Sequence, residues 1–158
     1  MRTAAGTCPN CGSEGPPLTE CDEKVCQLRG YRRIPSRYVS SPSRRVPDPL
    51  PGLMLGDHLI LRAIGSGTFG MVYLALQLPA EMEVAVKLLH LEDLPRGYKT
   101  KALENFESEA RALAVVKHPN VVQMFMFGTW RDQTYLITEY VDSAVTLALL
   151  HALECDVQ

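Results

Sequence analysis

Short apolar runs separated by polar or glycine-rich segments dominate the central part of the chain, and one longer segment has apolar residues at helical spacing. Residues 59–64 are rich in residues that favour strands, and residues 71–76 have no polar face at helical spacing, so each segment predicts a strand. A turn at 79–83 leads into a third predicted strand over 84–89. A helix is predicted from about Lys99 to Lys117, with an inward stripe of Leu103, Phe106, Ala110 and Leu113. Strands around a single main helix predict an α+β fold.

The first two predicted strands are joined by Gly65-Ser66-Gly67-Thr68-Phe69-Gly70-Met71-Val72. Glycines in such a loop remove Cβ atoms and let backbone N–H groups approach phosphate oxygens. The glycine pattern alone fits either a dinucleotide-binding turn or a kinase-type loop. A dinucleotide fold needs a helix after the loop, whereas residues 71–76 predict a strand. We therefore favour the kinase-type loop and ATP as its ligand.

Lys87 lies on the third predicted strand, on the same face as Ala85 by the period of two. A lysine on a mostly apolar strand needs a partner. Glu109 follows Phe106 by three residues and precedes Leu113 by four, so a helix places it on the inward stripe. Burying an unpaired carboxylate there is costly, and pairing with Lys87 would offset that cost. The sequence therefore predicts an ion pair between Lys87 and Glu109.

Five motifs in this order resemble the N-terminal lobe of protein kinases, specifically the eukaryotic-like serine/threonine kinases found in bacteria. They are Gly-x-Gly-x-Phe-Gly-x-Val at 65–72, Val-Ala-Val-Lys ending at Lys87, Phe-x-x-Glu-Ala at 106–110, His-Pro-Asn-Val-Val at 118–122 and Tyr-Leu-Ile-Thr-Glu-Tyr-Val at 135–141. The resemblance implies a kinase N-lobe over residues 53–141, with a five-stranded antiparallel sheet, one main helix and ATP as the ligand.

The resemblance also implies roles for single residues. Lys87 would contact the α- and β-phosphates, with Glu109 as its partner. Thr138 would be the gatekeeper, and the backbone at Glu139 and Val141 would bind the purine edge. The full set expected to bind the nucleotide is Ile64, Gly65, Ser66, Gly67, Thr68, Phe69, Gly70, Val72, Ala85, Lys87, Thr138, Glu139 and Val141.

Two family motifs are absent from these 158 residues. In kinases the catalytic base and the Mg²⁺ ligands lie on a His-Arg-Asp loop and an Asp-Phe-Gly segment of the second lobe. Trp130-Arg131-Asp132 lacks the Asn that follows a catalytic loop, so we predict a hairpin turn there. Residues 142–158 are expected to form the helix after the hinge, as the truncated start of the second lobe.

We therefore expect the ATP-binding portion of a serine/threonine kinase, which phosphorylates protein substrates. Mg²⁺ is expected only when the second lobe is present, and phosphoryl transfer is not expected from this stretch alone. A non-catalytic module that pairs with a partner kinase or another protein is the alternative, as is a zinc-ribbon nucleic-acid binder.

Residues 1–28 hold four of the five cysteines, in the pairs Cys8/Cys11 and Cys21/Cys26. Cys-Pro-x-Cys-Gly is typical of the first knuckle of a zinc ribbon, and thiolate pairs suit tetrahedral Zn²⁺ in an intracellular chain. The second pair has four intervening residues in place of the usual two. Zinc is the prediction, and a metal-free ribbon or disulfides are the alternatives.

Residues 29–52 form an Arg/Pro-rich segment with no acid before Asp48. Such a segment predicts a disordered linker that acts as a solvated tether. A basic contact with nucleic acid or acidic lipid is the alternative, although the chain as a whole has a net charge of −2. We therefore do not expect nucleic acid to be a main partner.

The composition, 46% hydrophobic and 22% charged, allows one modest core with appendages. No run of 18 apolar residues occurs, and the first ten residues lack the apolar centre of a signal peptide. A cytoplasmic location is the resulting expectation.

Overall fold

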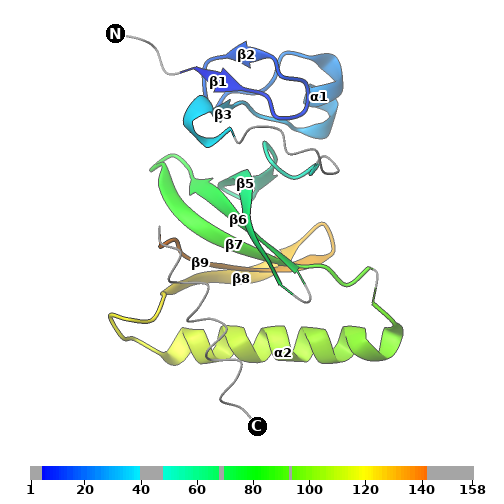
Figure 1. Cartoon of the computed structure of the whole chain (residues 1–158), viewed down its shortest axis with the longest axis vertical. Coiled ribbons are helices and arrows are strands. Elements are labelled where there is room, and N and C mark those ends of the chain that lie inside the picture. Colours follow the sequence, from blue (N-terminus) through cyan, green and yellow to red (C-terminus); the bar gives the residue numbers. More distant parts are fainter. Residues whose placement is uncertain (1–4, 40–47, 68–69, 93, 142–158) are drawn as a thin grey trace.

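The computed structural model describes residues 5–39, 48–67, 70–92 and 94–141. We call residues 5–39 the ribbon and the described residues from 48 to 141 the lobe. Figure 1 shows the ribbon at one end of the molecule, the main sheet in the middle and the long helix α2 at the opposite end. The predicted helix over 142–158 lies outside the described residues, as do Thr68 and Phe69.

The lobe contains an antiparallel sheet in the order β4-β5-β6-β7-β9-β8. Its strands are β4 (Met54–Leu55), β5 (His58–Gly67), β6 (Gly70–Gln77), β7 (Met82–Leu89), β8 (Met124–Trp130) and β9 (Gln133–Glu139). The main helix is α2 (Arg96–Val115). The predicted α+β lobe with five strands and one helix is confirmed in the five long strands, and β4 adds a two-residue edge strand.

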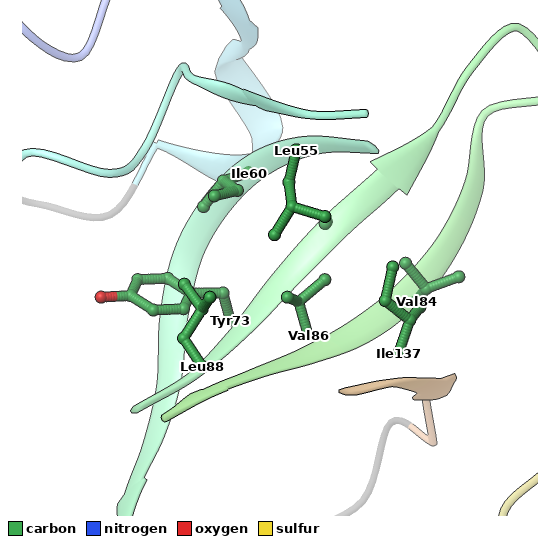
Figure 2. Close-up of a cluster of buried hydrophobic side chains, with 8 residues drawn as sticks. Leu55, Ile60, Tyr73, Val84, Val86, Leu88 and Ile137 are labelled. Atoms are coloured by element: carbon green, nitrogen blue, oxygen red, sulfur yellow. The ribbon is translucent and has the colours of Figure 1, made fainter. Parts of the chain in front are cut away.

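One face of the sheet carries the largest cluster of buried side chains, which Figure 2 shows in close-up. Every second residue of β7 contributes to it, which is the period expected of a strand. The cluster consists of Leu55, Ile60, Tyr73, Ala75, Val84, Val86, Leu88 and Ile137. Because these residues alternate with Ala85 and Lys87 along β7, that pair faces the other side of the sheet.

Helix α2 covers part of this second face. Phe106 and Ala110 of the predicted stripe are buried against Leu89 and Leu136, and Leu103 and Leu113 pack around them partly buried. The stripe was therefore predicted correctly. Burial of a side chain as large as Phe106 stabilises a fold by about 1.5–3 kcal/mol relative to leaving it exposed.

The ribbon contains three two-residue strands in the order β2-β1-β3 and two short helical segments. The elements are β1 (Gly6–Thr7), β2 (Glu14–Gly15), α1 (Lys24–Arg29), β3 (Ile34–Pro35) and the 3-10 turn η1 (Ser36–Tyr38). Strand β3 pairs antiparallel with β1, with Thr7 opposite Ile34. The ribbon therefore extends well past residue 28.

This extension corrects the prediction that residues 29–52 are a disordered linker. Arg33 is only 3% exposed and forms an ion pair with Asp22 at 2.6 Å. The hydrogen bond to Asp22 raises the pKa of Arg33, which stays charged. The composition of the segment suggested solvated arginines, but Arg32 and Arg37 also have acidic partners, Glu20 and Glu81. Residues 40–47 lie outside the described residues.

Within the described part of the chain, no helix is long and apolar enough to cross a membrane.

Candidate functional site

The register of the sheet places the predicted phosphate-binding and adenine-binding residues in two adjacent rows. Gly65 of β5 lies opposite Val72 of β6, and Val72 lies opposite Lys87 of β7. In the next row, Ala85 of β7 lies opposite Thr138 of β9. Residues directly opposite one another in a ladder project on the same face. The two rows therefore gather residues from four strands onto the face that α2 partly covers.

Lys87 and Glu109 form the ion pair expected between the third strand and the helix. The Lys87 Nζ donates to both carboxylate oxygens of Glu109, at 2.9 Å to Oε1 and 2.7 Å to Oε2. Both side chains are 34% exposed, so the pair is open to solvent on one side. The Lys87 Nζ also lies 5.5 Å from the centre of the Phe106 ring, close enough for a cation–π contact. An ammonium held in this way has hydrogen-bonding room left for an anionic ligand.

Further predicted purine-binding residues adjoin these rows along the chain, at Ile64 of β5 and from Glu139 at the end of β9. Ile64 is half-buried and packs against a cluster formed by Ile34, Leu59, Leu61, Leu74 and Leu76. The backbone N–H of Glu139 donates to Gln123 O at 2.8 Å, and the Glu139 carbonyl accepts from the Thr138 hydroxyl at 3.2 Å. Val141 is 41% exposed at the end of the described chain.

Gly70 is required for a reason that the motif does not reveal. A Cβ placed on it would overlap the backbone carbonyl oxygen of Leu88, whereas a Cβ on Gly67 would meet no atom within 4 Å. Gly70 lies opposite Leu89 in the ladder, so the close approach follows from the strand register. Gly70 is therefore required for strand pairing, whereas space alone does not require a glycine at position 67.

A family model described as the protein kinase domain matches residues 59–155. The chain belongs to the protein kinase domain family. The serine/threonine-protein kinase Pkn1 of Myxococcus xanthus is 34% identical over 104 residues, which are 66% of this chain and 15% of Pkn1. The serine/threonine-protein kinase pkn2 of the same organism is 40% identical over 96 residues, 61% of this chain and 11% of pkn2.

A solved crystal structure of a kinase domain is similar with a TM-score of 0.47 and 23% identity, covering 57% of this chain and 26% of that chain. The chain thus spans only a small part of the length of the curated relatives that it matches. The described lobe corresponds to the N-terminal lobe of a eukaryotic-like kinase.

The segment Trp130-Arg131-Asp132 of the kinase lobe is a hairpin turn, as predicted. Trp130 pairs with Gln133 across β8 and β9, so Arg131 and Asp132 form a two-residue loop. Both loop residues have positive φ, 48° and 64°, as a type I′ turn requires.

The four cysteines of the ribbon converge on one point. Their Sγ atoms all lie within 4.8 Å of one another, with Cys8 to Cys26 at 3.8 Å and Cys11 to Cys21 at 3.6 Å. Four sulfurs held about 2.3 Å from a Zn²⁺ in a tetrahedron lie roughly 3.8 Å apart. A disulfide needs about 2.05 Å. The spacing therefore fits a tetrahedral metal and excludes disulfides between these cysteines in this conformation.

Helix α1 explains the irregular spacing of the second cysteine pair. Cys26 lies within α1, whereas Cys21 precedes it, so the four intervening residues include the start of the helix. Burial raises the pKa of the Cys8 thiol to about 12, and a hydrogen bond from the Ser13 side chain lowers that of Cys11 to about 6. Binding of a cation would displace the remaining thiol protons.

Proposed function

We propose that this chain is the ATP-binding lobe of a serine/threonine protein kinase, as its family membership suggests. The observation that supports this most strongly is the ion pair of Glu109 with Lys87, because Lys87 lies in the same row of the sheet as Gly65 and Val72. Glu109 holds the ammonium in place, and Lys87 binds the α- and β-phosphates. The glycine-rich segment covers the phosphates, and ATP supplies the phosphoryl group that the whole kinase transfers to a protein.

The adenine binds at the second row of this site. Ile64, Val72 and Ala85 enclose its faces, and Thr138 lies behind it as the gatekeeper. Backbone groups at Glu139 and Val141 bind the purine edge. The exposed position of Val141 and the antiparallel pairing of Ala85 with Thr138 support this assignment.

These residues alone bind nucleotide without transferring phosphate. The sequence contains neither the His-Arg-Asp nor the Asp-Phe-Gly motif. Among the described residues, the four cysteines are the one group of side chains placed to hold a metal, and thiolates are not ligands for Mg²⁺. Transfer of radiolabel from ATP to a protein acceptor by this chain alone would contradict this part of the proposal.

Nucleotide titration of Lys87→Ala tests the site. Loss of hydrogen bonds from a charged group costs about 1.5–3 kcal/mol, so we expect the affinity for ATP to fall roughly 10- to 100-fold. Lys101→Ala is the matched control, because Lys101 is an exposed lysine on α2 and its loss changes the net charge equally. Equal affinities of Lys87→Ala and the unmodified chain, measured by calorimetry, would refute the assigned role.

We also propose that Cys8, Cys11, Cys21 and Cys26 bind one Zn²⁺ as a structural centre. Four thiolates at tetrahedral spacing support zinc over Mg²⁺ or Ca²⁺, which prefer oxygen ligands. The purified chain should contain one zinc per molecule by elemental analysis. Cys8→Ser should lower this to a small fraction, and Cys155→Ser should leave it unchanged. A zinc content near zero in the unmodified chain, even after incubation with Zn²⁺, would refute the metal site.

A further inference from the structure

The cysteine cluster shares its hydrophobic surroundings with the kinase lobe. Cys8, Cys21 and Cys26 are buried in one cluster with Tyr31 of the ribbon and Leu53 of the lobe. Two further lobe residues, Leu50 and Trp130, pack against this cluster and also against the main core of the sheet. The sulfur atoms are thus separated from the core of the lobe by a single layer of side chains.

A second contact joins the ribbon to the nucleotide end of the sheet. Ile34 of β3 is 2% exposed and belongs to the cluster of Leu59, Leu61, Leu74 and Leu76. Leu18 and Tyr38 of the ribbon pack against the same cluster. So do Ile64 and Tyr140, which lie in the predicted adenine pocket and hinge. The ribbon and the adenine site therefore rest on one apolar layer.

Hydrogen bonds also tie the ribbon to the segment before β4 and to β7. The Arg32 N–H donates to Gly52 O at 2.7 Å, and the Tyr31 hydroxyl donates to Pro49 O at 2.8 Å. The Tyr38 hydroxyl donates to Glu83 Oε1 at 2.5 Å, at the start of the strand that carries Lys87.

The first cysteine turn also contacts the lobe. A Cβ on Gly52 would lie 2.6 Å from Pro9 Cγ, and Gly52 has a φ of +88°. Pro9 lies between Cys8 and Cys11, so the turn that supplies two sulfurs packs directly on the segment leading into the sheet.

A ribbon of this size has too small a core to be stable without a cross-link or a packing partner. Its strands have two residues each, and chains below about 40 residues need disulfides, metals or a partner to fold. With the metal removed, the four thiols no longer cross-link the ribbon. The ribbon then loosens, and the contacts of Ile34, Tyr31 and Tyr38 with the lobe weaken.

We infer that metal occupancy of the four-cysteine centre controls the stability of the kinase lobe and, through the Ile34 cluster, its affinity for nucleotide. The nucleotide part of this inference rests on the proposed function, whereas the stability part does not. Chelation of the metal would then weaken ATP binding without any change at Lys87 or Glu109. The centre thereby makes the lobe responsive to metal availability.

The test compares the zinc-loaded chain with the same chain after chelation and after zinc is restored. The thermal midpoint should fall by roughly 5–15 °C on chelation. Amide hydrogen exchange in β5 and β6 should accelerate at least about tenfold. The fluorescence of Trp130, the single tryptophan of the chain, should change in parallel because it packs at the junction. Restored zinc should reverse all three changes, and ATP affinity should fall and recover with them.

Ile34→Ala distinguishes the effect of the packing between ribbon and lobe from the effect of zinc binding. This variant keeps the four cysteines and should retain one zinc per chain, yet its β5 and β6 amides should exchange faster. Leu28→Ala is the control, because Leu28 lies two residues after Cys26 on α1 but is 81% exposed. It should match the unmodified chain.

Unchanged exchange and thermal midpoint after complete zinc removal would overturn the inference and leave the proposed kinase function intact. A chain that takes up no zinc would overturn it as well. A zinc-loaded chain that shows the stability response but binds no nucleotide would refute the proposed function and the nucleotide part of the inference. It would leave the stabilising role of the ribbon established.

Discussion

Single residues of the glycine-rich segment have different physical requirements. We predict that Gly70→Ala destabilises the lobe by about 1–3 kcal/mol, because the new Cβ would overlap the Leu88 carbonyl and the strands must shift apart. Gly67→Ala meets open space and should change stability much less. Urea unfolding of both variants measures the difference. Equal midpoints would show that the strands accept a Cβ at Gly70 without cost.

The partner of a residue could be predicted from the sequence only where the periodicity of its strand or helix indicates that partner. The pairing of Lys87 with Glu109 followed from a period of two in a strand and an inward stripe in a helix. Arg33 was misjudged, because its partner Asp22 lies eleven residues away and only the fold of the ribbon brings them together. The requirement for Gly70 comes from the register of β6 with β7, which a single sequence does not specify.

Helix α2 is held to the sheet mainly through its apolar stripe. Phe106 is 3% exposed and contacts Phe127 with ring centres 5.9 Å apart. We predict that Phe106→Ala lowers the free energy of unfolding by about 3–5 kcal/mol. Tyr98→Ala, on the same helix but 63% exposed, should change it by about 0.5 kcal/mol or less. Chemical denaturation followed by circular dichroism compares them, and similar losses would contradict this packing.

Long elements were predicted closely and short ones were missed. The strands predicted over 71–76 and 84–89 correspond to β6 and β7, and the helix predicted over 99–117 begins three residues earlier and ends two residues earlier. Strands β1 to β4 have two residues each, too few to show a period. Helix α1 has only six residues and was not predicted, although its start accounts for the irregular spacing from Cys21 to Cys26.

At the scale of the whole molecule, the ribbon and the lobe form one packed structure. The sequence suggested two objects joined by a tether, since arginine and proline are common in linkers. Residues of that segment instead have partners across the junction, as Arg37 has in Glu81, and Gly52 packs closely against Pro9. Contacts between segments far apart in the sequence carry no periodic signal, so composition alone was misleading here.

The central claim is that Lys87 binds the phosphates of ATP in the lobe of this kinase-family chain. An acyl-phosphate derivative of ATP acylates the lysine amine nearest the phosphates, and mass spectrometry identifies the modified residue. We predict that Lys87 is labelled first in the zinc-loaded chain and that free ATP suppresses this labelling. Lys24, Lys99, Lys101 and Lys117 should react slowly and without competition by ATP. Equal labelling of all five lysines, or labelling of Lys87 that free ATP leaves unchanged, would contradict the nucleotide site.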